Sequence, residues 1–149
     1  DDMTLKFLTP KERSFIKKHI PFTVDLTRQT AEDNDVFEQK DNWVIKPHDS
    51  YASKGVYAGV EFDNKADWKK AVEKALSEHY ILQRYCPPHE NIDLLYDEKA
   101  EYRSYSNITG LFLYGGKFAG IYSRIAKNSI ISTQYSEMSL PSMVIKEKN

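Results

Sequence analysis

The sequence predicts an α+β domain with a mostly antiparallel sheet and two or three helices. Two apolar stretches, 102–114 and 117–125, flank Gly115-Gly116, and a two-residue glycine turn is typical of a β-hairpin. Residues 64–79 carry apolar side chains at helical spacing. Ten tyrosines and seven phenylalanines favour a sheet over a helix bundle. The length of 149 residues is that of one domain with its own core.

The first helix should begin at Pro10. Thr9 suits the N-cap, Pro10 the first helical position, and Glu12 can complete a capping box. Pro21 should end this helix. Residues 23–34 are polar and are expected to form a loop or a weak helix.

Strands are expected at 43–46 and 56–62. The clearest helix follows at 64–79, with Asn64 as its N-cap. Its apolar stripe is expected to pack on a sheet, and its members are Trp68, Val72, Ala75 and Leu76. A strand at 80–85, a loop rich in acids at 87–100, the hairpin and a short strand at 130–133 complete the order.

The composition excludes several classes of partner. The net charge is -1 and the pI is about 6.5, so nothing indicates binding to nucleic acid or to an anionic membrane. The chain has one cysteine, Cys86, and no apolar run of membrane-spanning length. Its opening residues, DDMTLKFL, lack the basic and apolar regions expected of a signal peptide. A reducing compartment is therefore expected, and we predict a cytoplasmic protein. Because the first methionine is Met3, the chain is expected to be a piece of a longer protein.

The stretch 43–60 has the pattern of a clamp on nucleotide phosphates. Lys46 ends an apolar strand, where lysine loses hydration unless an anion pairs with it. A phosphate or a neighbouring carboxylate could be that anion. The loop that follows offers hydroxyl, ammonium and backbone N–H donors from Ser50, Ser53, Lys54 and Gly55. The alternative is an ordinary β-hairpin with a polar tip.

Three further residues could meet a nucleotide. Gln83 lies where a strand runs into the loop at Pro87-Pro88, and there it could bond an adenine edge or belong to an ordinary edge strand. Arg103 and Arg124 interrupt apolar strands of the predicted hairpin. Two planar guanidinium groups on one sheet surface would suit a polyphosphate or an acyl phosphate. The alternative is a pair of surface arginines bonded to acids such as Glu101.

Common catalytic motifs are missing from the sequence. It contains no GxxxxGK[ST], GxGxxG, GxSxG or HExxH, and its four histidines have no metal-ligand spacing. The VIK at 44–46 is similar to the kinase lysine strand. The glycine loop follows this lysine instead of preceding it, however, and the HRD and DFG motifs are absent.

The order of these elements resembles the ATP-grasp fold. The best fit is to circularly permuted ATP-grasp proteins related to glutathionylspermidine synthase. Similar features are the turn at Gly115-Gly116, the G-x-x-x-R of 120–124, the Ile-Ile-Ser of 130–132 and the opening helix within LTPKERSFIKKHIPFT. The resemblance covers about residues 5 to 145.

The resemblance implies an ATP-dependent ligase that joins a carboxylate to an amine through an acyl phosphate. It implies that Lys46 holds the α- and β-phosphates and that Ser50, Ser53, Lys54 and Gly55 form a lid. Gln83 and the backbone of Arg84 and Tyr85 would meet the adenine. Arg103 and Arg124 would neutralise the transferred phosphoryl group, since such transfer depends on positioning and electrostatics.

The family also needs Mg²⁺, and the chain departs from its pattern here. Its end, STQYSEMSLPSMVIKEKN, has no acid followed by E-x-N. The metal ligands are therefore expected outside this chain. The chain would then be the nucleotide-binding, C-terminal part of a longer ligase and is expected to be inactive alone.

Two other functions remain open. A non-catalytic interaction module would use the sheet as a scaffold for a protein partner, with Lys46 and the arginines in surface ion pairs. A nucleic-acid binder could stack bases on its aromatic residues, but the net charge argues against it.

Overall fold

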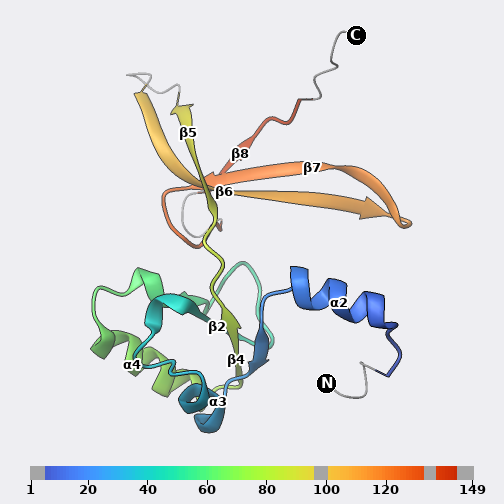
Figure 1. The fold of residues 1–149 in the computed structure, drawn as a ribbon. Helices are drawn as coiled ribbons and strands as arrows, with labels where there is room; N and C mark the ends of the chain where they lie inside the picture. The colour runs from blue at the N-terminus through green and yellow to red at the C-terminus, as the bar shows by residue number, and fades with distance from the viewer. Residues whose placement is uncertain (1–5, 96–100, 133–136, 144–149) are drawn as a thin grey trace. The chain divides into compact units, whose positions relative to one another are not determined.

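The computed structural model describes residues 6–95, 101–132 and 137–143. These residues divide into two compact units (Figure 1). Unit 1 contains the described residues up to Ser50 together with Gly55–Cys86, and unit 2 contains Tyr51–Lys54 and the described residues from Pro87 onward. With helices and two antiparallel sheets, the described chain has the predicted α+β class. That it acts as a single domain stays a prediction.

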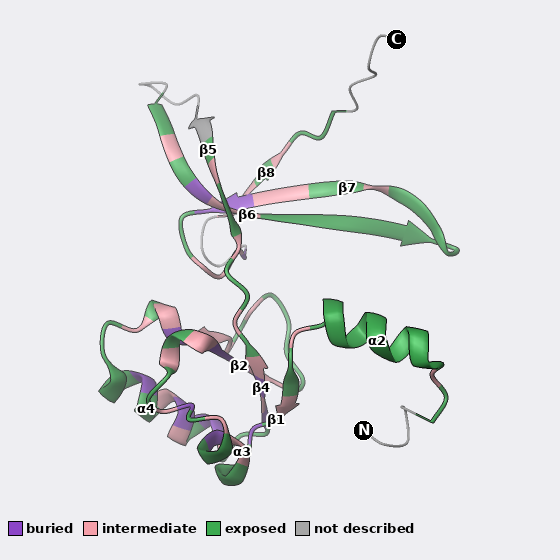
Figure 2. Ribbon diagram, in the orientation of Figure 1, coloured by how far each residue is buried: buried purple, intermediate pink, exposed green. Residues whose placement is uncertain are grey.

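Helix α2, Pro10–His19, begins as the sequence predicts. The Thr9 hydroxyl accepts from the Glu12 N–H, and the Glu12 carboxylate accepts from the Thr9 N–H at 2.7 Å. These bonds satisfy donors that a helix start otherwise leaves unpaired. The helix is exposed along its whole length (Figure 2). Its stability therefore depends on its caps more than on packing.

The sheet of unit 1 has the strand order β1-β4-β2-β3, and every pairing is antiparallel. Its strands are β1 (Thr23–Asp25), β2 (Trp43–Pro47), β3 (Tyr57–Ala58) and β4 (Tyr80–Arg84). The predicted strands at 43–46 and 80–85 are confirmed as β2 and β4. They lie side by side at the centre of the sheet.

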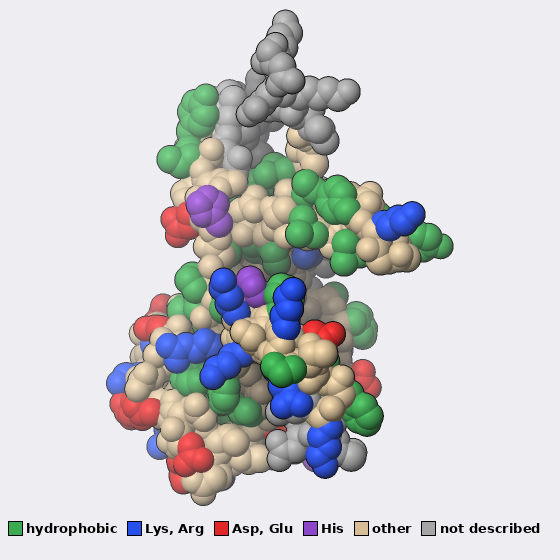
Figure 3. All heavy atoms as spheres, turned by 45° about the vertical axis from the view of Figure 1, so that its right-hand side comes forward, with side chains coloured by type: hydrophobic (Ala, Val, Ile, Leu, Met, Phe, Trp, Pro, Cys, Tyr) green, Lys and Arg blue, Asp and Glu red, His purple; other side chains and the backbone are tan. Residues whose placement is uncertain are grey.

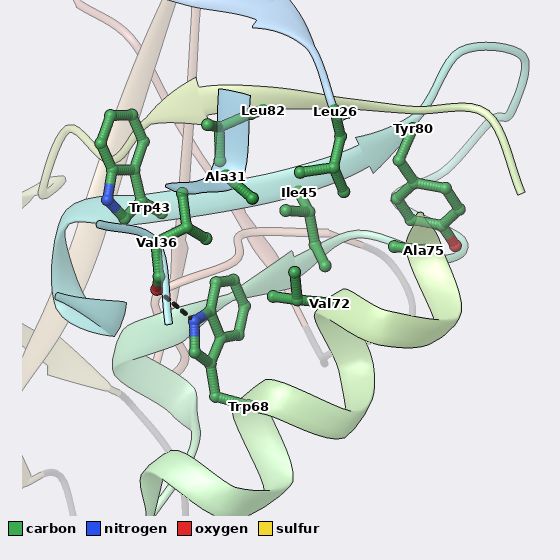
Figure 4. Close-up of a cluster of buried hydrophobic side chains, with 10 residues drawn as sticks. All are labelled: Leu26, Ala31, Val36, Trp43, Ile45, Trp68, Val72, Ala75, Tyr80 and Leu82. Carbon is green, nitrogen blue, oxygen red and sulfur yellow. Dashed lines mark hydrogen bonds between the residues drawn. The ribbon is translucent and has the colours of Figure 1, made fainter. Parts of the chain in front are cut away.

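Helix α4, Lys65–Ala75, covers one face of this sheet (Figure 4). Asn64 caps it, because its side chain accepts from the Asp67 N–H at 2.9 Å. The predicted apolar stripe is confirmed, and Trp68 and Val72 are fully buried. The short helix α3, Arg28–Asp33, contributes Ala31 to the same core. Two 3-10 turns, η1 (Lys40–Asn42) and η2 (Gly59–Glu61), lie beside each other.

The sheet of unit 2 has the order β5-β6-β7-β8 and is also antiparallel. Its strands are β5 (His89–Leu95), β6 (Glu101–Tyr114), β7 (Lys117–Ala126) and β8 (Met138–Leu140). The predicted hairpin is confirmed as β6 and β7. Gly115 and Gly116 have φ of 56° and 74°, and positive φ at both positions is the reason why this tight turn favours glycine.

Several predicted boundaries are wrong. The segment 23–34 contains strand β1 as well as α3, and the acidic segment 87–100 contains β5, while 96–100 lie outside the described residues. The expected strand at 56–62 is cut to two residues, because the chain turns into η2 at Gly59. No strand forms at 130–132, and Thr133 lies outside the described residues. Strands β1 and β5 form by pairing with β4 and β6, which the composition of their own segments does not reveal.

Gly59→Ala should destabilise unit 1. A Cβ at Gly59 would lie 1.9 Å from the Lys40 carbonyl oxygen, so the two turns would have to move apart. Overpacking of this kind costs about 1–3 kcal/mol, measurable by urea denaturation. Gly110→Ala is the matched control, because its Cβ would lie 3.5 Å from the nearest atom. Equal stability of the two variants would contradict the close approach at Gly59.

Candidate functional site

The second face of the unit 1 sheet carries polar side chains. Thr23 lies opposite Gln83, and Asp25 and Lys46 both lie opposite Ile81. Directly opposed residues share a face, and alternate residues along a strand do so too. The residues between them on the strands, among them the buried Trp43, Ile45 and Leu82, lie on the opposite face, toward α4. We call Thr23, Asp25, Lys46, His48 and Gln83 the polar sheet face.

Lys46 and Gln83 are in direct contact on this face. The Lys46 ammonium donates to Gln83 Oε1 at 2.5 Å, and Gln83 Nε2 donates to Thr23 Oγ1 at 2.8 Å. Burial lowers the pKa of Lys46 from its ordinary value of 10.5, and the nearby Cys86 thiol offsets part of this effect. Among the described residues, no carboxylate pairs with Lys46. The structure thus places a half-buried cation against a neutral acceptor.

Asp25 and His48 form a second pair on the polar sheet face. His48 Nε2 lies 3.0 Å from Asp25 Oδ1, and both side chains are at least half exposed. Thr23 and Asp25 were not predicted as site residues, because their segment was expected to form a loop or a weak helix. The signal was the alternation Thr-Val-Asp, in which Val24 packs against the core.

The predicted adenine contacts are already hydrogen-bonded within unit 1. The Arg84 N–H donates to the Phe22 carbonyl at 2.9 Å, and the Tyr85 N–H donates to the Asn42 carbonyl at 2.8 Å. The Arg84 guanidinium lies over the Trp43 ring, 5.3 Å from its centroid. An adenine would therefore have to compete with these bonds, and the Gln83 side chain likewise already bonds Lys46 and Thr23.

The predicted phosphate loop is divided between the two units. Ser50 and Gly55 belong to unit 1, and a tight turn at Tyr51–Lys54, which holds Ser53 and Lys54, belongs to unit 2. Gly55 has a φ of 76°, and a Cβ there would lie 2.9 Å from the Tyr80 hydroxyl. Both the positive φ and the close Tyr80 hydroxyl therefore favour glycine over any other residue at position 55.

The tip of this loop is strained and anchored. Ala52 and Ser53 have φ of 50° and 59°, a left-handed conformation that costs a residue with a Cβ about 1 kcal/mol or more. The Ser132 hydroxyl donates to the Ala52 carbonyl at 3.1 Å. A lid movement of this tip would have to break this bond.

The two predicted arginines lie on opposite faces of the unit 2 sheet. Arg124 pairs with Ile108 in the register of β6 and β7, whereas Arg103 is an odd number of residues away from Ile108 on β6. Their expected position on one sheet surface is therefore wrong, because side chains alternate along a strand. The sequence carries no direct signal for the register of β6 against β7, which determines the residues of the two strands that share a face.

Both arginines have acidic partners. Arg103 Nη2 donates to Glu101 Oε2 and Arg124 Nη1 donates to Glu137 Oε2, each at 3.0 Å. Glu137 is 11% exposed, and the Arg124 guanidinium also lies 5.7 Å from the centroid of the Tyr122 ring. Arg124 is thus the better held of the two.

The surfaces of the two units differ in character. Figure 3 shows many Lys and Arg side chains on unit 1 in this view, whereas hydrophobic side chains are frequent along the β6–β7 hairpin. The described residues also form an open hollow of about 320 Å³ along α2. The residues that line it are Leu8, Lys11, Glu12, Phe15 and Ile16. None of the predicted site residues is among them, so the polar sheet face is the stronger candidate.

Comparisons with models of protein families, with curated proteins and with solved structures found no significant match to this chain. Within residues 6–95, 101–132 and 137–143, no three His, Cys, Asp or Glu side chains gather as a metal site would require. Among the described helices, none combines the length and the apolar character that crossing a membrane demands.

Proposed function

We propose that this chain is the nucleotide-binding part of an ATP-grasp carboxylate–amine ligase. One observation carries the proposal: Lys46 is half-buried, keeps only a neutral hydrogen-bond partner, and pairs with no acid in the described part of the chain. An ammonium group has three N–H donors, and Gln83 uses one. The remaining charge and donors suit the oxygens of a phosphate.

The proposed roles combine what the family resemblance implies with the contacts that each side chain makes within its own unit. Lys46 holds the α- and β-phosphates, and Gln83 orients its ammonium. Ser50 and Gly55 lie in the loop that follows β2 and supply a hydroxyl and a backbone N–H. Arg124, fixed by Glu137 and the Tyr122 ring, is the better candidate for neutralising phosphoryl charge. Mg²⁺-bound ATP would supply the phosphoryl group that activates a carboxylate toward an amine. We place the metal ligands outside this chain and the protein in the cytoplasm.

A non-catalytic scaffold for a protein partner is the second candidate. The acidic partners of Arg103 and Arg124 favour it, as do large apolar side chains of the hairpin that are more than half exposed, among them Leu111, Leu113 and Phe118. This function also requires an acid beside Lys46, and the described residues place Gln83 there. That difference makes nucleotide binding the better-supported function.

ADP affinity should fall at alkaline pH. Phosphate binding needs the charged ammonium of Lys46, and burial lowers the pKa of that group below 10.5. Affinity should therefore be steady near pH 7.5 and decline before pH 10.5, approaching about tenfold per pH unit above the pKa of the free protein. Calorimetric titration from pH 7.5 to 10 would measure this change.

Lys46→Arg is the control, because a guanidinium remains charged throughout this range. Its ADP affinity should stay nearly constant with pH. Parallel declines in wild type and Lys46→Arg would show that another group controls binding. Absence of ADP binding at pH 7.5 in the wild-type chain would favour the scaffold function.

A further inference from the structure

A chain of hydrogen bonds crosses the polar sheet face and ends at Lys46. The Thr23 hydroxyl donates to the Pro21 carbonyl at 2.9 Å, and Gln83 Nε2 donates to Thr23 Oγ1 at 2.8 Å. The Lys46 ammonium donates to Gln83 Oε1 at 2.5 Å. The hydrogen-bond chain therefore connects Pro21, which follows the C-cap of helix α2, to the proposed phosphate-binding lysine.

The direction of this chain follows from the chemistry of its groups. A carbonyl oxygen can only accept, so the single hydrogen of the Thr23 hydroxyl goes to Pro21. Thr23 Oγ1 can then only accept from Gln83, which places the amide nitrogen toward Thr23. The amide oxygen must in turn face Lys46. Thr23 and Lys46 thus favour the same orientation of the Gln83 amide, and Thr23 anchors its far end.

We propose that Thr23 is a positioning residue for Lys46 and acts through the amide of Gln83. The inference rests on the proposed nucleotide-binding function. A glutamine oxygen holds the ammonium in place without neutralising it, so its charge stays available for a phosphate. A carboxylate in the same place would compete with the ligand. If the amide turned over, its N–H groups would face the ammonium and repel it.

Thr23→Val should lower the pKa of Lys46. Valine keeps the shape and β-branching of threonine but cannot anchor the amide, so the ammonium loses a fixed acceptor. We expect a decrease of about one pKa unit, the size of one hydrogen bond to a charged group. NMR titration of ¹³C-lysine-labelled protein, with the Lys46 signal assigned through Lys46→Arg, would measure it. Thr23→Ser should restore the wild-type pKa.

Other titratable groups near Lys46 have to be followed in the same experiment. Asp25 and His48 share its sheet face, and Cys86 interacts with it electrostatically. The ordinary pKa values of an aspartate and a histidine side chain lie well below that of a lysine, whereas that of a cysteine lies closer to it. A Cys86→Ser background removes that group. The effect of Thr23→Val should persist there.

Thr23→Val should also weaken ADP binding by about tenfold, and Thr23→Ser should restore it. In a Gln83→Ala background, Thr23→Val should have no further effect, because the connection to Lys46 is already broken. Thr109→Val is the matched control: this exposed strand threonine bonds Asn107 and Ser123 in unit 2. It should leave both the Lys46 pKa and ADP affinity unchanged.

Two results would overturn the inference. One is an unchanged Lys46 titration in Thr23→Val, and the other is an equal effect of Thr23→Val with and without Gln83. Failure of the nucleotide-binding proposal gives a different result, because the wild-type chain would then bind no ADP while Thr23→Val still shifted the Lys46 titration.

Discussion

A Lys46→Met variant should lose ADP binding and still fold. Methionine has a similar length and fills the same half-buried position, but it offers no charge and no donor. A hydrogen bond between charged groups is worth about 1.5–3 kcal/mol, so the affinity should fall by about 10- to 100-fold or more. Calorimetric titration with ADP would measure the loss.

The stability of this variant should not fall by more than about 1 kcal/mol. Burial disfavours the charged form of Lys46 and lowers its pKa, so the unfolded chain binds more protons between that lowered pKa and 10.5. Wild-type stability should therefore rise with pH across this window. Removal of the charge offsets the lost bond to Gln83, and this benefit should be largest near neutral pH. Urea denaturation at pH 7 and pH 10 would measure both effects.

Lys74→Met is the matched control for this change. Lys74 is an exposed residue of α4, and its nitrogen lies 3.9 Å from Glu78. Its replacement should leave both ADP affinity and stability within error. A Lys46→Met protein that binds ADP like the wild type would contradict the proposed phosphate contact.

Trp68→Ala should produce the largest loss of stability. Trp68 is fully buried, its Nε1 donates to the Val36 carbonyl at 2.8 Å, and its ring lies edge-on to Phe62 at 5.4 Å. Truncation removes this packing and leaves a cavity and an unpaired buried carbonyl. We expect a loss of about 3–5 kcal/mol in the free energy of unfolding, measured by urea denaturation followed by circular dichroism.

Tyr114→Ala is the control for this truncation, because Tyr114 is 85% exposed at the end of the hairpin. Its loss should change stability by about 0.5 kcal/mol or less. If Trp68→Ala cost as little as Tyr114→Ala, Trp68 could not occupy the core shown in Figure 4.

Local chemistry explains which elements could be predicted from the sequence. The start of α2 depends on Thr9 and Glu12, the start of α4 on Asn64, and the hairpin turn on two glycines. Each signal lies within a few residues of the element that it specifies. The apolar stripe of α4 likewise reports the face that the helix buries.

The other elements depend on strand pairing, which their own residues do not reveal. Strand β1 has three residues, too few for a periodic pattern, and forms by pairing with β4. Strand β5 contains acids and still pairs along β6, as charged edge strands do. The division into two sheets also depends on these pairings, which local propensity does not determine.

The same distinction between local signals and strand pairing applies to the candidate site. Lys46 and Gln83 were recognised separately, each from its place in a strand. Their contact depends on the register of β2 against β4, across 37 residues of sequence. Thr23 was missed because the strand that carries it was missed, and the two arginines were placed on one surface because their parity on long strands was not known.

Titration of ADP into ¹³C-lysine-labelled protein, followed at the Lys46 side chain, tests the proposed site most directly. We predict that the Lys46 signal shifts and saturates with ADP and that its pKa rises in the complex, because the phosphate stabilises the ammonium form. The exposed Lys74 should not respond. A Lys46 signal and pKa that stay unchanged at saturating ADP would contradict the phosphate contact and with it the nucleotide-binding function of this face.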